Sequence, residues 1–281
     1  MKAFSIRDDL EVIRSGYDES GFVIVRDVIP SSALDAVHAD MRRVLEAQAV
    51  RLGGKPDPQA DLYESLVALH GTNLDIYLQS VRLVAKLASV FSLFLEPNVA
   101  RLMAALGVTT PVWLTSPVLH VMSGRLRIPG GYFGVDVHQD WPALQSSLDA
   151  VTGWIPLFDV SEGTYPMEVA PRSHLLGLLP GKPAQHVYEI EPDALARLQF
   201  VPLAVPRGGI AMMSGFTVHR SNLAGGDSLR VAFSHRYENA LEPSFVARGF
   251  PSAQSRTIRR ELLQPGFPTP EQVGRIYGAG N

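Results

Sequence analysis

The stretch VDVHQDWP, Val135 to Pro142, places a histidine and an aspartate two positions apart, in a pattern that alternates like a β-strand and stops at Trp141-Pro142. Alternate side chains of a strand point to the same face, so His138 and Asp140 are expected to converge while Gln139 faces away. Imidazole and carboxylate are both common ligands of divalent metals. Two ligands do not close a metal site, so a third has to come from elsewhere in the chain.

The natural third ligand is His219 in SGFTVHRSN, Ser214 to Asn222, which follows a turn at Gly208-Gly209. Two histidines and one carboxylate form the facial triad of non-haem Fe(II) oxygenases and leave coordination positions open. Arg230 follows 11 positions later in another strand pattern. Its rigid guanidinium can hold a carboxylate by two charge-assisted hydrogen bonds, as an oxygenase that uses 2-oxoglutarate requires.

Composition restricts the classes of protein that fit. The chain has 281 residues, 46% of them apolar, and a formal net charge of -3, which gives no basic field for nucleic acid. The absence of cysteine leaves metal binding to histidine and carboxylate ligands. We expect one domain over residues 1–281, with a helical third at about 1–110, a β-rich core at about 111–240 and an extension at about 241–281.

No membrane or secretory segment is expected. The first ten residues are charged and lack an apolar core, so the expected location is cytoplasmic. The most apolar segment, Val81 to Leu95, contains Arg82, Lys86 and Ser89 and is too short and too charged to span a bilayer. We expect a small-molecule partner, with no nucleic acid and no membrane.

The order of the expected elements runs from helices to strands. Apolar spacing of three and four residues predicts helices at 8–20, 31–51, 60–79, 81–95 and 97–106, with a strand at 22–26 after a C-terminal glycine at Gly21. From Pro111 onward, short alternating runs predict strands near 112–122, 131–138, 151–160, 166–170, 186–190, 200–204, 210–213, 217–219 and 229–237. Helices followed by many short strands indicate an α+β protein in which helices brace a β sandwich or barrel.

These segments together resemble the phytanoyl-CoA dioxygenase family of Fe(II)/2-oxoglutarate oxygenases over most of the chain. The resemblance is carried by GFVIVRDVIP (Gly21 to Pro30), His138-Gln139-Asp140, GWIPLFDVSEG (Gly153 to Gly163) with VAPRSH (Val169 to His174), and HRSNLAGGDSLR (His219 to Arg230). It implies a double-stranded β-helix core, also called a jelly roll and cupin-like, braced by the N-terminal helices. The family usually has Pro-Gly-Ser-His where this chain has Pro-Arg-Ser-His, a loop difference that leaves the triad intact.

The resemblance assigns roles to individual positions. It implies that His138, Asp140 and His219 are the catalytic iron ligands, and that Arg230 anchors 2-oxoglutarate with help from Ser221. His120 and Trp154 are expected to line the cosubstrate pocket. Substrate contacts are expected from residues that flank the triad and from the helical third, which is expected to cover the mouth of the pocket; the flanking candidates are Tyr132, Phe133, Asp136, Gln139, Trp141 and Arg236.

The function implied is that of a dioxygenase with Fe(II), 2-oxoglutarate and dioxygen, which hydroxylates a substrate and releases succinate and CO2. Because Asp140 is present, no coordination position is vacant for a halide, and halogenation is disfavoured. A polar small molecule, either a secondary metabolite or a glycan precursor, is the expected substrate; Trp141 could stack on a ring and Arg236 could meet an acidic group. The alternatives are another oxidative outcome (desaturation, cyclisation or epimerisation), a zinc hydrolase or isomerase, and a non-catalytic jelly roll that binds metal or ligand.

Overall fold

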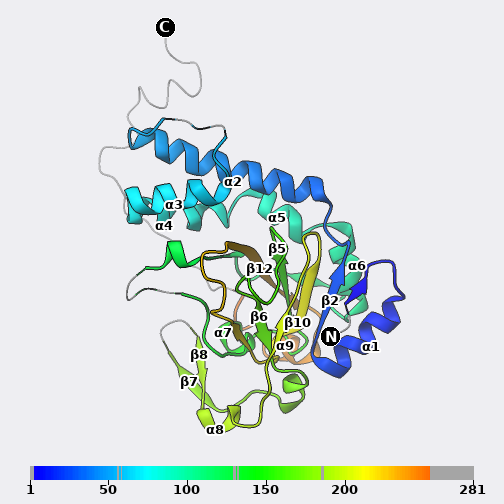
Figure 1. Ribbon diagram of the computed structural model, residues 1–281. Helices are drawn as coiled ribbons and strands as arrows, with labels where there is room; N and C mark the ends of the chain where they lie inside the picture. The colour runs from blue at the N-terminus through cyan, green and yellow to red at the C-terminus, as the bar shows by residue number, and fades with distance from the viewer. Residues whose placement is uncertain are drawn as a thin grey trace.

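Most helices lie in the first part of the chain; in Figure 1 α2 to α5 lie above the central sheet and α1 lies beside it. The computed structural model describes residues 3–55, 57, 59–128, 131, 133–184 and 187–253. The long helices of this part all precede the core: α1 (Leu10–Ser20), α2 (Ser31–Arg51), α3 (Leu62–Thr72), α4 (Leu74–Val84), α5 (Ala88–Phe94) and α6 (Pro97–Ala105). Shorter helices follow in loops: η1 (Gly124–Leu126), α7 (Trp141–Leu144), η2 (Ser173–Leu176), α8 (Pro192–Leu195) and α9 (Pro243–Ala247).

The helix predictions hold for α1 and α2 and fail at two joints. Gly21 ends α1 with a left-handed φ of 84°, as the glycine signal predicts. The helix expected over 60–79 is instead split at Asn73, whose extended backbone ends α3 and whose side chain accepts a hydrogen bond from the Ile76 amide to cap α4. The helix expected over 81–95 is likewise two, because α4 ends at Val84 and α5 begins at Ala88.

The described residues of the β-rich part form three sheets. The large sheet has the order β1-β2-β10-β5-β12-β3, with β4 also paired to β12; a second has the order β11-β6-β9, and β7 pairs with β8 alone. All pairings are antiparallel except that of β1 with β2. The strands are β1 (Phe4–Ser5), β2 (Phe22–Arg26), β3 (Pro111–Val112), β4 (Val118–Met122), β5 (Val151–Pro156), β6 (Met167–Val169), β7 (Gly181–Pro183), β8 (Tyr188–Ile190), β9 (Val201–Leu203), β10 (Ile210–Ser214), β11 (His219–Ser221) and β12 (Arg230–Asn239).

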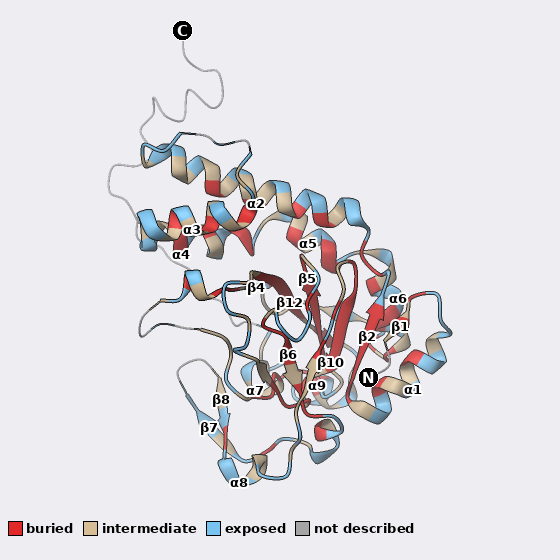
Figure 2. Cartoon of the chain, viewed as in Figure 1, coloured by how far each residue is buried: buried red, intermediate tan, exposed pale blue. Residues whose placement is uncertain are grey.

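Strand alternation divides the core into two layers. On β10, Ile210 and Met212 pack with the helices, whereas Ala211 and Met213 pack against residues of the second sheet. The inner strands of the large sheet are therefore buried on both faces (Figure 2), which explains their nearly continuous apolar sequences. The layer between the two sheets is where polar side chains can be enclosed, and this curled pair of sheets is the expected jelly-roll core.

The strand expected at 131–138 is wrong for the described part of that segment. Gly134 has a left-handed φ of 85°, and His138 makes an isolated bridge to His219, with each backbone amide donating to the other's carbonyl at 3.0 Å. Asp140 then adopts a helical conformation before α7, where Pro142 lies in the first turn. His138 and Asp140 therefore converge through a bridge followed by a turn, not through strand alternation.

Among the described residues, no single helix is both long and apolar enough to cross a membrane. Within that part of the chain, only the bent pair of α4 and α5, taken together, has the length and apolar composition of a membrane span.

Candidate metal centre

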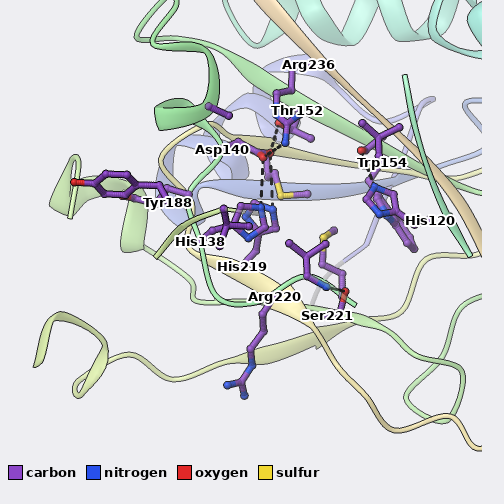
Figure 3. A pocket seen from close by; sticks show the side chains of 18 of the residues that line it. His120, His138, Asp140, Thr152, Trp154, Tyr188, His219, Arg220, Ser221 and Arg236 are labelled. Atoms are coloured by element: carbon purple, nitrogen blue, oxygen red, sulfur yellow. Dashed lines mark hydrogen bonds and ion pairs between the residues drawn. The ribbon is translucent and has the colours of Figure 1, made fainter. Parts of the chain in front are cut away.

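Three buried side chains from two distant segments meet between the sheets. Each of His138, Asp140 and His219 offers one ligand atom, and these atoms lie within 4.8 Å of one another. The Nε2 atom of His138 is 3.5 Å from Asp140 Oδ1, and that of His219 is 3.8 Å from Asp140 Oδ2. Figure 3 shows the two imidazoles side by side below the carboxylate. Two nitrogens and one carboxylate on a single face are the donor set that a divalent iron accepts.

The outer nitrogens of both imidazoles are fixed by the backbone. Nδ1 of His138 lies 2.7 Å from the carbonyl of Asp136, and Nδ1 of His219 lies 2.9 Å from the carbonyl of Thr217. A carbonyl only accepts, so each Nδ1 has to carry the proton and each Nε2 keeps its lone pair for a metal. Burial lowers the pKa of His219 to about 4, which keeps this ring neutral at ordinary pH.

Asp140 is held by two residues that face each other across β5 and β12. The Thr152 hydroxyl donates to Oδ2 at 2.6 Å, and the guanidinium of Arg236 binds Oδ1. Thr152 and Arg236 are directly paired in the register of β5 and β12, so both hydrogen-bond donors lie at the same position of the sheet. Burial alone raises the pKa of Asp140, but the positive charge of Arg236 and the neighbouring His219 and His138 together outweigh it and hold the pKa well below the usual range.

The same cavity, of about 370 Å³, is lined on β12 by Arg230, Ser234 and Arg236. Alternation along β12 turns all three to the inner face. Arg230 is 2% exposed and donates to the Tyr165 carbonyl at 2.5 Å. Its guanidinium carbon lies 5.9 Å from the centre of the Trp154 ring.

The other expected cosubstrate residues line this cavity as well. Burial, together with the positive charge of Arg230, lowers the pKa of His120 to about 3, and Nε2 of His120 is 2.9 Å from the Ser234 hydroxyl. Ser221 accepts a hydrogen bond from the Val135 amide at 3.0 Å, which leaves its hydroxyl proton able to donate into the cavity. The structure thus gathers His120, Trp154, Ser221 and Arg230 in one cavity with the triad.

The expected substrate residues are more scattered. Tyr132 lies outside the described residues. Phe133 and Asp136 line a neighbouring pocket, where the Phe133 ring packs against Tyr165 at 5.7 Å. The Gln139 amide is used by the backbone, because it donates to the carbonyls of Gly177 and Phe216 and accepts from the Leu179 amide.

Arg236 and the helical third differ most from expectation. The Arg236 guanidinium lines the cavity, but its partner is Asp140 and not the acidic substrate group that was expected. Every residue that lines this cavity, within the described chain, lies between Val118 and Arg236. The described part of the helical third therefore packs against the sheet and contributes no lining residue, contrary to the expectation that it covers the mouth.

Several further lining residues are absent from the sequence expectations, among them Thr152 and Tyr188. Thr152 lies in the buried strand β5 two positions before Trp154, so alternation could have placed it on the same inner face. Tyr188 comes from the β7–β8 hairpin, and no motif near it signals a site. Trp141 stacks on Phe216 with ring centres 5.4 Å apart and lines a second cavity beside the first.

A jelly roll with a His-Asp-His cluster and a buried arginine defines the class of non-haem oxygenases. The sequence model of the phytanoyl-CoA dioxygenase (PhyH) family matches residues 17–232. The chain belongs to this family, as the sequence resemblance predicts, and the expected class of enzyme, dependent on iron and 2-oxoglutarate, is confirmed. Among curated proteins, none matches the sequence significantly.

Solved structures share the fold at low identity. The α-ketoglutarate-dependent carbocyclase SnoK from nogalamycin biosynthesis is 19% identical, with a TM-score of 0.57 over 88% of this chain and 94% of its own. The epimerase SnoN, solved with Fe3+, α-ketoglutarate and nogalamycin RO, is 18% identical, with a TM-score of 0.54 over 89% and 93%. EctD from S. alaskensis, solved with bound Fe, is 14% identical, with a TM-score of 0.55 over 86% and 80%.

Proposed function

We propose that this protein hydroxylates a small organic molecule with Fe(II), 2-oxoglutarate and dioxygen, and that His138, Asp140 and His219 hold the iron. The observation that carries the proposal is the convergence of two Nε2 atoms and one carboxylate in the cavity that also contains the buried guanidinium of Arg230. The donor set fits iron because both Nδ1 protons are fixed on carbonyls and Asp140 stays ionised.

The lining residues beside the triad bind the cosubstrate. Arg230 supplies the cation for the distal carboxylate of 2-oxoglutarate, and the Ser221 hydroxyl donates a further hydrogen bond to it. Trp154 closes the cavity beside Arg230 and excludes water there. When bound, iron and 2-oxoglutarate supply the dioxygen-dependent oxidation that releases succinate and CO2.

Hydroxylation is the proposed outcome because the triad keeps its carboxylate, so no coordination position is left vacant for a halide. The carbocyclase and epimerase among the structural neighbours are named for other outcomes on a related fold. Desaturation, cyclisation or epimerisation is therefore the second candidate, and analysis of the product decides between them.

Succinate release tests the proposal. Protein supplied with Fe(II) and 2-oxoglutarate should form succinate in air and none without dioxygen, whereas a zinc hydrolase or isomerase would form no succinate under either condition. His138→Ala and Asp140→Ala should each lose bound iron and succinate formation together. A variant that lost iron yet kept forming succinate would contradict the assignment, and wild-type protein that bound iron without forming succinate would favour the non-catalytic alternative.

A further inference from the structure

The substrate side of the cavity can be separated from the cosubstrate side. In Figure 3, Tyr188 lies on one side of the triad, and His120 and Trp154 lie on the other. The proposed cosubstrate cation, Arg230, belongs to the side of Trp154. The side of Tyr188 is therefore the one that remains for the substrate.

On that side a second cavity adjoins the first. Ala143, Val187 and Tyr188 line both, so the two spaces are adjacent beside α7 and the β7–β8 hairpin. The second space, of about 460 Å³, is bounded by Trp141, Pro142, Gln145, Leu178, Pro183 and Ala184 in addition to the shared residues. We call these two adjacent spaces the substrate groove; its outer part is within the size range of ordinary ligand pockets.

The charges along the groove are already neutralised. Asp140 is paired with Arg236, and Arg220 is paired with Glu168 at 2.6 Å and points away from the triad (Figure 3). With Arg230 assigned to the cosubstrate, no charged side chain among the described lining residues of the inner cavity remains for a substrate ion. The outer part has no charged lining residue in the described chain.

The charges beside the groove are also in use. Lys182 and Glu189 on the hairpin pair with each other at 3.8 Å. Arg248 lies 5.9 Å from the centre of the Trp141 ring but donates to the backbone carbonyls of Gln145 and Ser146. An ionic substrate group inside the groove would lose its hydration without gaining a free opposite charge from the described lining residues, which is strongly unfavourable.

The walls are stiff and largely apolar. Trp141 is supported from behind by Phe216, and the Tyr188 hydroxyl is fixed on the Gly181 carbonyl at 2.7 Å. A supported indole beside proline and leucine favours a flat, apolar ring system, which gains from stacking and from area burial. We propose that the substrate is an uncharged molecule with an apolar ring body that lies along this groove. Its reacting carbon lies between Ala143 and Tyr188. This inference rests on the proposed function and replaces the polar substrate that the sequence suggests.

A matched pair of leucines tests the proposal. Leu178 lines the outer groove, whereas Leu176, two residues earlier, lines neither cavity; both are about half exposed, at 47% and 56%. The probe is 1,4-dihydroxyanthraquinone, its anionic control is the corresponding 2-sulfonate, and its polar control is methyl glucoside. Leu178→Asp should weaken binding of the anthraquinone at least about tenfold, and Leu176→Asp should change it less than about twofold. Leu178→Asp changes only a side chain, so the Gly177 carbonyl and the Leu179 amide can still bind Gln139.

The wild-type protein should bind the uncharged probe more tightly than the sulfonate or the glucoside. Tighter binding of the sulfonate or the glucoside, equal effects of the two leucine variants, or no binding of the anthraquinone would each overturn the proposal. Titrations of Co(II) and 2-oxoglutarate on the same variants keep the two hypotheses apart. If the wild-type protein binds neither Co(II) nor 2-oxoglutarate, the proposed function is contradicted. If it binds both but does not bind the anthraquinone, only the proposed substrate class is contradicted.

Discussion

Asp140 is the residue on which the geometry of the centre depends. Its two oxygens have different partners, a threonine hydroxyl on Oδ2 and a guanidinium on Oδ1, so the carboxylate plane is fixed before any metal arrives. Only 2% of Asp140 is exposed, and removing one partner of a buried charge is strongly destabilising because the charge is left uncompensated. Groups that orient a ligand in this way affect metal affinity nearly as strongly as the ligands do.

Thr152→Val keeps the shape of the side chain and removes the hydrogen bond to Oδ2. We expect the affinity for Fe(II) or Co(II) to fall by about 10-fold to 100-fold, the usual range for groups that orient a ligand. Metal titration followed by the cobalt absorption spectrum measures it. Thr72→Val, which removes a hydroxyl bonded to the Ala68 carbonyl on an exposed helix, is the control. Equal metal affinity in both variants would remove Thr152 from the centre.

Arg230→Ala should leave iron binding intact and weaken 2-oxoglutarate binding by at least about 10-fold, because each charge-assisted hydrogen bond contributes about 1.5–3 kcal/mol. Titration of 2-oxoglutarate into the metal-loaded protein measures it. Arg220→Ala is the matched control, since Arg220 lines the same cavity but is paired with Glu168. Unchanged cosubstrate affinity in Arg230→Ala means that the anchor lies elsewhere.

At the scale of elements, the turn between α1 and β2 connects the helical layer to the centre. The Gly21 carbonyl accepts from the Thr217 hydroxyl at 2.7 Å, and the Thr217 carbonyl holds Nδ1 of His219. His174, in the loop motif of the family, lies beside the same turn with Nε2 3.1 Å from the Asp18 carbonyl. His174 therefore contacts this turn from η2 and is not part of the His-Asp-His cluster.

Gly21→Ala tests this turn. The left-handed φ of 84° disfavours any side chain by about 1 kcal/mol, and an added Cβ would overlap the imidazole of His174. The backbone conformation alone accounts for about 1 kcal/mol, and the overlap with His174 adds to it. We therefore expect urea denaturation to show a free energy of unfolding lower by more than about 1 kcal/mol. Gly163→Ala is the control, because a Cβ there meets no atom within 4 Å. A loss no larger than in the control would show that the turn adapts freely.

At the scale of the whole molecule, the buried acid Glu238 links stability to pH. Burial raises the pKa of Glu238 from 4.5 to about 7, although the charge of Arg236 opposes the shift. The folded protein therefore keeps a proton that the unfolded chain releases between these pH values. This contribution makes the free energy of unfolding fall as pH rises through about 4.5 to 7, and the cost is complete above that range.

Glu238→Gln removes the ionisation. At pH 8 the variant should be more stable than the wild type, by up to about 3 kcal/mol from the size of the shift, and near pH 4.5 the two should nearly agree. Urea denaturation at the two pH values measures the difference, with the exposed Glu19→Gln as control for removal of a surface charge. A difference between wild type and Glu238→Gln that is the same at both pH values would contradict the shifted pKa.

The sequence by itself determined the family, the types of the three ligands, and the elements whose signals are local. The strand Phe22–Arg26 and the long helix from Ser31 follow from apolar periodicity and a glycine or proline at their ends. Val151, Ile210 and Arg230 also begin strands close to where alternation predicts them. These features depend on neighbours within a few residues, which is why a single sequence reveals them.

Only the tertiary structure decided how the centre is assembled. The turn that brings Asp140 to His138 depends on the backbone bridge to His219, 81 positions away, and the pairing of Thr152 with Arg236 depends on the register of two strands. Because of that register Arg236 pairs with Asp140, and the groove beside Trp141 has no free charge among its described lining residues. Contacts of this kind are fixed by the packing of the whole sheet, because local preferences act within one segment and do not choose partners in another.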